Sequence, residues 1–326
     1  MTMMIDFKTI LFATLLMTAC GPQRPAAVSN PIVRTSTAFS ADSAYRNAAT
    51  QLAFGPRVPN TAAHDSCAAW IVSELERYGV GVEVQRETVR AYDGTALYCQ
   101  NITGHIRPEA EHRVLLIAHW DSRHVADNDS RRANRSLPVP AANDGASGAA
   151  ILLEIARVAS VETPATGIDL LFADAEDYGA PDTWTGKHSE EDWALGTQVW
   201  AREAARKGYR ADYGILLDMV GAPDATFYRE YFSERYAPGT TDLVWSIALE
   251  MGYGTLFVNS EGPAITDDHV FVNRIAHIPT IDIIDTRQQT GHTFYPYWHT
   301  TDDTLDKLSK ETLGKVGHVL TALLFK

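Results

Sequence analysis

The chain has 326 residues, of which 45% are hydrophobic and 21% are charged, a composition that is typical of globular proteins. Its 41 acidic and 28 basic residues give a formal charge of −13, which argues against nucleic-acid binding because an acidic surface repels a phosphate backbone. No run of about 18 apolar residues is present, which argues against a permanent membrane-spanning helix. An α/β chain of this length often forms one core, so we expect one domain.

Residues 1–19 predict an export signal. Lys8 precedes an apolar stretch at 10–17 that is too short to span a bilayer and is typical of a signal peptide. Small residues directly before Cys20 resemble the bacterial lipoprotein signal, which implies that Cys20 becomes the lipid-bearing first residue of the mature chain. A Pro-rich flexible linker at 20–38 follows, and it disfavours the alternative of a buried apolar helix. We therefore expect an exported lipoprotein that faces the periplasm and reaches the membrane only through its lipid.

Helices and strands alternate through the predicted catalytic domain at 39–326. Apolar periodicity, with N-cap and glycine stop signals, predicts helices at 40–54, 61–78, 146–159, 194–207, 241–251 and 310–325. Strands are predicted at 80–89, 97–106, 114–118, 168–173, 214–217 and 280–284. Several of these strands are wholly apolar, which indicates an α/β fold whose sheet is buried on both faces. Residues 178–193 predict a long insertion loop, and such loops often carry function.

Cys67 and Cys99 are the only other cysteines. An exported compartment permits a disulfide between them, but the sequence does not show that their Cα atoms approach closely enough. Two separately buried thiols are the alternative.

Polar residues gather where the apolar strands end. His119 and Asp121 follow one strand, Glu176 and Asp177 follow the next, and Asp218 follows a third. Open α/β sheets bind ligands at this edge of the sheet. Two further residues, Asp144 before a helix and His299 before the last helix, complete a set of histidines and carboxylates that suits zinc.

Each of these residues has an ordinary structural explanation when taken alone, since Asp144, for example, could simply cap its helix. Burying all of them together is costly unless a cation compensates their charge. The set therefore predicts a metal site.

Several motifs resemble the zinc aminopeptidase superfamily, and four features resemble its glutaminyl cyclases more closely. The superfamily motifs are Ala118-His119-Trp120-Asp121-Ser122, Asn143-Asp144-Gly145-Ala146-Ser147-Gly148, Ala175-Glu176-Asp177, Leu217-Asp218 and Trp298-His299-Thr300. The cyclase-like features are the stretch 216–223, Thr266-Asp267-Asp268-His269, the Trp-bearing insertion and the stretch 298–303. The resemblance implies a single α/β domain with a mixed, mostly parallel, twisted sheet between helices.

The resemblance also implies the roles of the site residues. Asp144, Asp177 and His299 would bind zinc, Glu176 would transfer the proton, and Asp218 and Asp267 would be its hydrogen-bonding partners. The superfamily pattern has Glu-Glu at positions 176 and 177, so the shorter Asp177 is a departure, although zinc accepts either carboxylate. Trp298 and Phe294 are candidate walls of the substrate pocket, although aromatic residues more often belong to a core.

The implied reaction is the conversion of an N-terminal glutamine of peptides or proteins to pyroglutamate with release of ammonia. Zinc would polarise the side-chain carbonyl, and Glu176 would carry the proton from the attacking amine to the departing ammonia. We expect one functional zinc, held by Asp144, Asp177 and His299, with His119 and Asp218 present but not ligating. His119 and Asp121 are candidate residues of a second site or of the surroundings of the first. Two ions remain possible, because His119, Asp144 and Asp218 could form a second site. The alternatives are a zinc aminopeptidase that uses the same ligands to activate water, and a binding domain without catalysis.

Overall fold

The computed structural model describes residues 38–287 and 293–325, and the account below refers to this part of the chain. The predicted signal peptide at 1–19, Cys20 and all but the last residue of the linker at 20–38 lie outside it.

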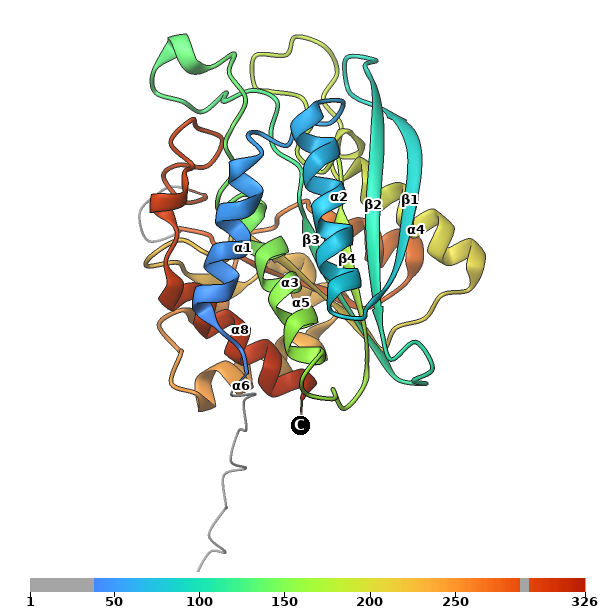
Figure 1. The fold of residues 1–326 in the computed structure, drawn as a ribbon. Helices are drawn as coiled ribbons and strands as arrows, with labels where there is room; N and C mark the ends of the chain where they lie inside the picture. Colours follow the sequence, from blue (N-terminus) through green and yellow to red (C-terminus); the bar gives the residue numbers. More distant parts are fainter. Residues whose placement is uncertain (1–37, 288–292, 326) are drawn as a thin grey trace, which may run out of the picture. The chain divides into compact units, whose positions relative to one another are not determined.

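Six strands form the central sheet, in the order β1-β2-β4-β3-β5-β8 (Figure 1). Their bounds are β1 (Gly81–Arg90), β2 (Ala96–Ile106), β3 (Arg113–His119), β4 (Gly167–Ala173), β5 (Tyr213–Asp218) and β8 (Thr280–Ile284). The strands β4, β3, β5 and β8 are parallel to one another, and β1 and β2 form an antiparallel hairpin that joins the sheet next to β4. The sheet is therefore mixed and mostly parallel, as predicted.

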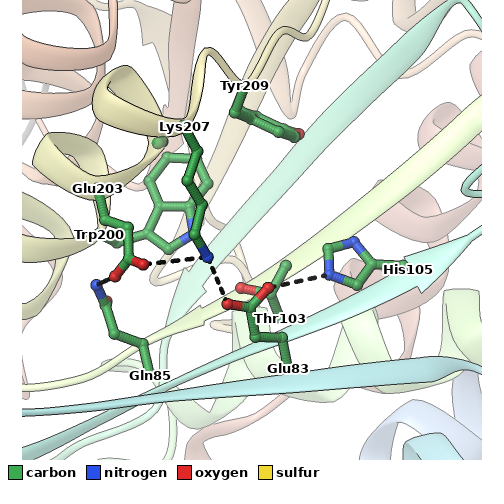
Figure 2. Close-up of a pocket in the computed structure, with 9 residues that line it drawn as sticks. Glu83, Gln85, Thr103, His105, Trp200, Glu203, Lys207 and Tyr209 are labelled. Atoms are coloured by element: carbon green, nitrogen blue, oxygen red, sulfur yellow. Dashed lines mark hydrogen bonds and ion pairs between the residues drawn. The ribbon is translucent and has the colours of Figure 1, made fainter.

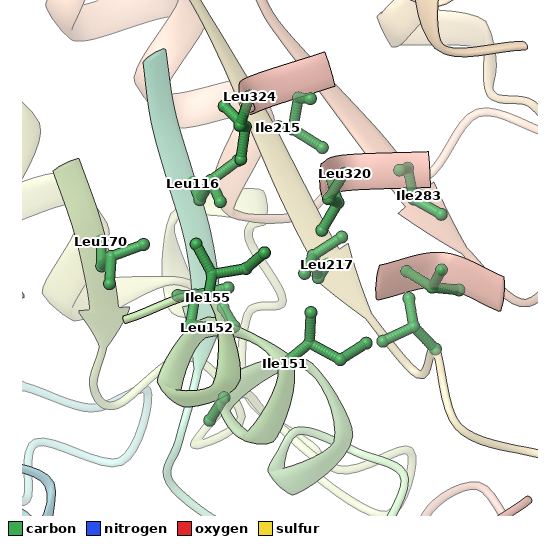
Figure 3. Close-up of a cluster of buried hydrophobic side chains, with 14 of the residues drawn as sticks. Leu116, Ile151, Leu152, Ile155, Leu170, Ile215, Leu217, Ile283, Leu320 and Leu324 are labelled. Carbon is green, nitrogen blue, oxygen red and sulfur yellow. The ribbon is translucent and has the colours of Figure 1, made fainter. Parts of the chain in front are cut away.

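Helices cover both faces of this sheet, as its apolar strands require. One face carries α1 (Ala41–Ala53), α2 (Ala62–Arg77), α3 (Ala146–Ala159) and α8 (Lys310–Leu324), which lie in front of the strands in Figure 1. Here Leu116 of β3 packs with Ile155 of α3 and Leu320 of α8 (Figure 3). The other face carries α4 (Leu195–Lys207), where Leu115 and Ile117 of β3 pack with Ala201. Alternate residues of one strand thus enter two separate cores.

Side chains cap the N-terminal ends of three long helices, and the cap of the first, Ser40, was predicted from the sequence. Ser40 and Thr61 cap α1 and α2 by accepting backbone N–H hydrogen bonds, and Ser309 does the same for α8. Helix α6 (Pro238–Glu250) begins three residues before the predicted start, because proline is well suited to the first turn of a helix.

Several short elements were not predicted. They are the parallel pair β6 (Phe227–Arg229) and β7 (Phe257–Glu261), the helices α5 (Tyr231–Tyr236) and α7 (Asp268–Phe271), the π-helical turn η3 (Val272–Ala276) and the 3₁₀ turns η1 (Arg132–Asn134), η2 (Glu190–Asp192) and η5 (Leu305–Lys307). Most of these elements contain too few residues to show a hydrophobic period, and β7, which is as long as β8, is mostly polar and exposed where β8 is apolar and buried.

Cys67 and Cys99 are both buried and carry free thiols, so the alternative of two separate cysteines is the one observed. Among the described residues, no helix is both long and apolar enough to cross a membrane.

Candidate metal and catalytic site

The predicted site residues meet at the carboxyl ends of the parallel strands. His119 and Asp218 are the last residues of β3 and β5. Glu176 and Asp177 follow β4 after Ala175, whose left-handed backbone (φ 51°) turns the chain at this point. All four residues are buried. The neighbouring order β4-β3-β5 therefore brings them together at one edge of the sheet, where α/β proteins bind ligands.

Asp144, Asp177 and His299 form the predicted ligand group. The Nε2 atom of His299 lies 3.2 Å from Oδ1 of Asp177 and 3.7 Å from Oδ2 of Asp144. One potential ligand atom from each residue lies within 4.8 Å of those of the other two, and all three residues are buried. Oδ2 of Asp144 and Oδ2 of Asp177 have no hydrogen-bond partner. Two orphaned carboxylate oxygens beside an imidazole fit a bound divalent cation, and this N/O donor set suits zinc.

A second group contains His119, Asp144 and Asp218 and meets the same 4.8 Å limit. The Nε2 atom of His119 lies 3.0 Å from Oδ1 of Asp144 and 3.3 Å from Oδ1 of Asp218. Asp144 therefore faces both groups, with Oδ1 toward His119 and Oδ2 toward His299.

Asp144 does not cap its helix, because the N-cap position of α3 is Gly145 and no side chain caps this helix. The Asp303 carboxylate instead accepts hydrogen bonds from the backbone N–H groups of Asn143 and Asp144 and so fixes the chain before the helix. A Cβ atom on Gly145 would lie 2.3 Å from Nε2 of His119, so the packing of His119 requires glycine there.

Asp121 supports the loop that carries Glu176 and Asp177. One of its oxygens accepts a hydrogen bond from the backbone N–H of Glu176, and the other accepts one from Asp177. The first of these oxygens also lies 3.4 Å from Nδ1 of His119. Asp121 thus holds residues near the site without belonging to either ligand group.

The proposed proton-transfer residue, Glu176, is buried among acidic neighbours. Burial raises its pKa well above the usual range of a glutamate, and the nearby Asp267 raises the pKa further while His119 opposes it. Burial likewise raises the pKa of Asp218 to about 6, against the hydrogen bond from His119. Asp267 is buried before α7, and its pKa is raised by burial as well. A carboxyl group with a raised pKa can both accept and return a proton near neutral pH.

The predicted pocket residues lie beside His299. The Trp298 ring stacks on the His299 ring with centroids 3.7 Å apart, and Phe294 lies 4.5 Å from Trp298. Phe294, Trp298 and Asn128 line a pocket of about 390 Å³. Both aromatic residues are partly exposed, and they also pack against the buried cluster of Met219, Ala222, Ile284 and Tyr295, so each belongs to a pocket wall and to the edge of a core.

A different, smaller pocket of about 70 Å³ lies between α4 and the β1–β2 hairpin (Figure 2). Its polar lining groups pair with one another, since Lys207 contacts Glu83 and Glu203, and Gln85 donates to Glu203. It contains none of the predicted site residues.

Three residues that the sequence did not single out one by one surround the candidate metal ligands. The buried Arg123 contacts Asp177, and Asp127 lies 3.4 Å from Nδ1 of His299. Trp193, at the end of the insertion, lies parallel to the His299 ring with centroids 6.2 Å apart. Trp193 belongs to the insertion at 178–193 that the sequence had singled out as a whole, whereas the only signal for Arg123 and Asp127 was their place just after the His119 motif.

Comparison with known proteins identifies the family of the chain. The model of peptidase family M28 matches residues 101–324. The structure of Bacteroides thetaiotaomicron glutaminyl cyclase bound to N-acetylhistamine is 47% identical, covers 88% of this chain and 98% of its own, and superposes with a TM-score of 0.86. A Zn-dependent exopeptidase from Parabacteroides distasonis is 46% identical with the same coverage of both chains and the same TM-score. The glutaminyl-peptide cyclotransferase of Drosophila melanogaster is 26% identical over 81% of this chain and 75% of its own. The chain therefore belongs to peptidase family M28 and is related to the bacterial glutaminyl cyclases.

Proposed function

We infer that the chain is a glutaminyl-peptide cyclotransferase, which converts the N-terminal glutamine of peptides or proteins to pyroglutamate and releases ammonia. The similarity to the B. thetaiotaomicron glutaminyl cyclase extends over nearly the whole length of that enzyme. The observation that carries the inference for this chain is the pairing of a candidate zinc site with the buried Glu176, whose raised pKa suits proton transfer.

The proposed ligands are Asp144, Asp177 and His299, which between them offer two orphaned carboxylate oxygens and an imidazole nitrogen. When bound there, zinc supplies Lewis-acid polarisation of the glutamine side-chain carbonyl.

Glu176 is the proposed general base and acid. Its carboxylate accepts a proton from the substrate's N-terminal amine, which attacks the side-chain carboxamide, and it returns the proton to the departing ammonia. Asp218 and Asp267 are the proposed partners that share this proton. The negative charge of Asp267 raises the pKa of both Glu176 and Asp218. The nucleophile and the carboxamide belong to one residue, so much of the rate enhancement depends on holding that residue in its reactive conformation. Trp298 and Phe294 are the proposed walls that hold it.

One functional zinc is proposed rather than two. Two carboxylate oxygens of the two ligand groups are buried without a hydrogen-bond partner: Oδ2 of Asp144, which belongs to both groups, and Oδ2 of Asp177, which belongs only to the group with His299. A histidine nitrogen faces carboxylate oxygens in both groups, so the proposal rests on the chemistry, because cyclisation needs only one Lewis acid. A second cation would also compete for Asp218 and lower the basicity of Glu176.

The proposed location is outside the cytoplasm, with the mature chain starting at Cys20 and anchored by lipid on the periplasmic side of a membrane. This proposal rests on the sequence of the first 20 residues.

Mass spectrometry of products separates this function from its competitor. A peptide that begins with glutamine should become lighter by one molecule of ammonia and keep all its residues. The competing activity is aminopeptidase, which the intact group of His119, Asp144 and Asp218 would allow. Release of free glutamine instead of ammonia would assign the chain to that activity.

A further inference from the structure

We propose that Arg123 and Asp127 form a positioning pair that fixes Asp177 and His299 in the geometry needed to bind zinc. This inference rests on the metal site proposed above, and it assigns a role to two residues outside that site.

The contacts of Asp127 point to its role. The carboxylate Oδ1 of Asp127 lies 3.4 Å from Nδ1 of His299, the ring nitrogen opposite the one that faces Asp177 and Asp144. A carboxylate on the far nitrogen of a metal-binding histidine fixes the ring's tautomer and orientation and makes the near nitrogen a better donor. Removing such a partner typically weakens metal affinity about 10- to 100-fold.

Arg123 links Asp127 to the second ligand. Its Nε and Nη2 atoms donate to the two oxygens of Asp127 at 2.7 Å each, which is the paired geometry that only a guanidinium offers. Its Nη1 atom donates to Oδ1 of Asp177 at 3.2 Å and leaves Oδ2 of Asp177 without a protein partner. One rigid planar group therefore connects ligands that follow two different strands.

The surroundings of Arg123 leave it little freedom. Its side chain is only 1% exposed, and Nη1 also donates to the backbone carbonyl of Asp177 at 3.2 Å. The Trp193 ring covers the guanidinium at 4.9 Å from its centroid. The pair is thus built into the fold, unlike an exposed ion pair, whose two side chains are mobile.

The test uses two variants. Asp127→Asn keeps the shape of the carboxylate, and Arg123→Lys keeps the positive charge but loses the two parallel N–H donors of the guanidinium. The matched control is Asp302→Asn, because Asp302 is an exposed carboxylate three positions from His299 and pairs with Arg131 on the surface. Zinc affinity is measured by competition with a chromophoric chelator in the absence of substrate, and folding by circular dichroism and by the Tm of the metal-free protein. The kcat at saturating zinc is measured separately.

Asp127→Asn and Arg123→Lys should each bind zinc about 10- to 100-fold more weakly than the wild type, with wild-type circular dichroism. Their kcat should recover most of its value when zinc is saturating. Asp302→Asn should change zinc affinity by no more than about twofold, since exposed pairs contribute little. If Arg123 served only to balance charge, lysine would keep the zinc affinity. Wild-type zinc affinity in Arg123→Lys would therefore overturn the role of the paired guanidinium donors.

Unchanged affinity in both folded variants, or loss of folding in both, would overturn the proposal. A wild type that binds no zinc would overturn it too. If the wild type binds zinc but forms no pyroglutamate, the proposed function fails, while the comparison of zinc affinities still decides the role of the pair.

Discussion

Nε2 of His299 lies 3.2 Å from Oδ1 of Asp177, although the two residues belong to loops that follow different strands of the sheet. Asp177 follows β4 and His299 lies beyond β8, with β3 and β5 between them in the sheet order. Such closeness of a buried carboxylate and a buried imidazole depends on the tertiary fold, and a metal ion bound between them would compensate the cost of burying them.

Glu176→Gln should abolish turnover while zinc stays bound, because the amide has the shape of the carboxylate but cannot accept the proton of the amine. A fall in kcat of at least about 10²-fold is expected. Asp144→Ala, Asp177→Ala and His299→Ala should lose both activity and metal. Metal content and rate are measured side by side, and a Glu176→Gln enzyme that kept a tenth of the wild-type rate would refute the assigned role.

Gly148→Ala should destabilise the fold, because a Cβ at this position of α3 would lie 2.2 Å from the carbonyl oxygen of Leu217 in β5. Overpacking of this kind costs about 1–3 kcal/mol of unfolding free energy, or more. Gly239→Ala is the matched control: this glycine lies in α6 and is exposed, and the Cβ that alanine adds would meet no atom within 4 Å. Alanine there should raise the free energy of unfolding by about 0.4–1 kcal/mol. Urea unfolding of both variants measures whether the two changes have opposite signs.

His124 should make the fold less stable in mild acid. Burial, aided by the positive charge of Arg123, lowers its pKa from 6.5 to about 4, and its ring stacks on Tyr178 at 3.9 Å. The unfolded chain therefore takes up this proton more readily, so the free energy of unfolding falls as the pH drops from about 6.5 to about 4. The total loss from this group is on the order of 3 kcal/mol.

His124→Gln should remove this contribution. The free energy of unfolding is measured between these two pH values for both proteins, and their difference isolates His124 from other titrating groups. A difference that does not change with pH would show that the histidine is not held neutral.

Cys20→Ala should release the protein from membranes, because the proposed anchor is lipid alone and stable anchoring takes two or more acyl chains. Membrane fractionation of cells that express the variant and the wild type provides the measurement. A variant that still sediments with the membrane would count against lipidation of Cys20.

The sequence predicted best those elements that show a helical hydrophobic period or a continuous apolar run. The helix predicted at 146–159 is α3 to the residue, and the strand predicted at 280–284 is β8. The pair β6 and β7 escaped prediction because Phe227–Arg229 is too short to show any alternation. The order of the strands in the sheet could not be predicted from a single sequence either, because it depends on which crossover connections the chain makes.

The site was predictable where its residues follow strands or belong to motifs, and both ligand groups came together as expected. The supporting contacts were not predictable, because Arg123 and Asp127 have no meaning until the loop brings them to Asp177 and His299. The motifs alone likewise could not show which oxygen of Asp144 faces which histidine.

A zinc titration tests the central claim, that one ion held by Asp144, Asp177 and His299 serves the cyclisation. The enzyme is stripped with a chelator, zinc is added back in known amounts, and pyroglutamate formation from a glutamine-initiated peptide is followed. Activity should rise in proportion to zinc and saturate at one equivalent per chain. A requirement for two equivalents, with cleavage of other N-terminal residues appearing at the same point, would contradict the account.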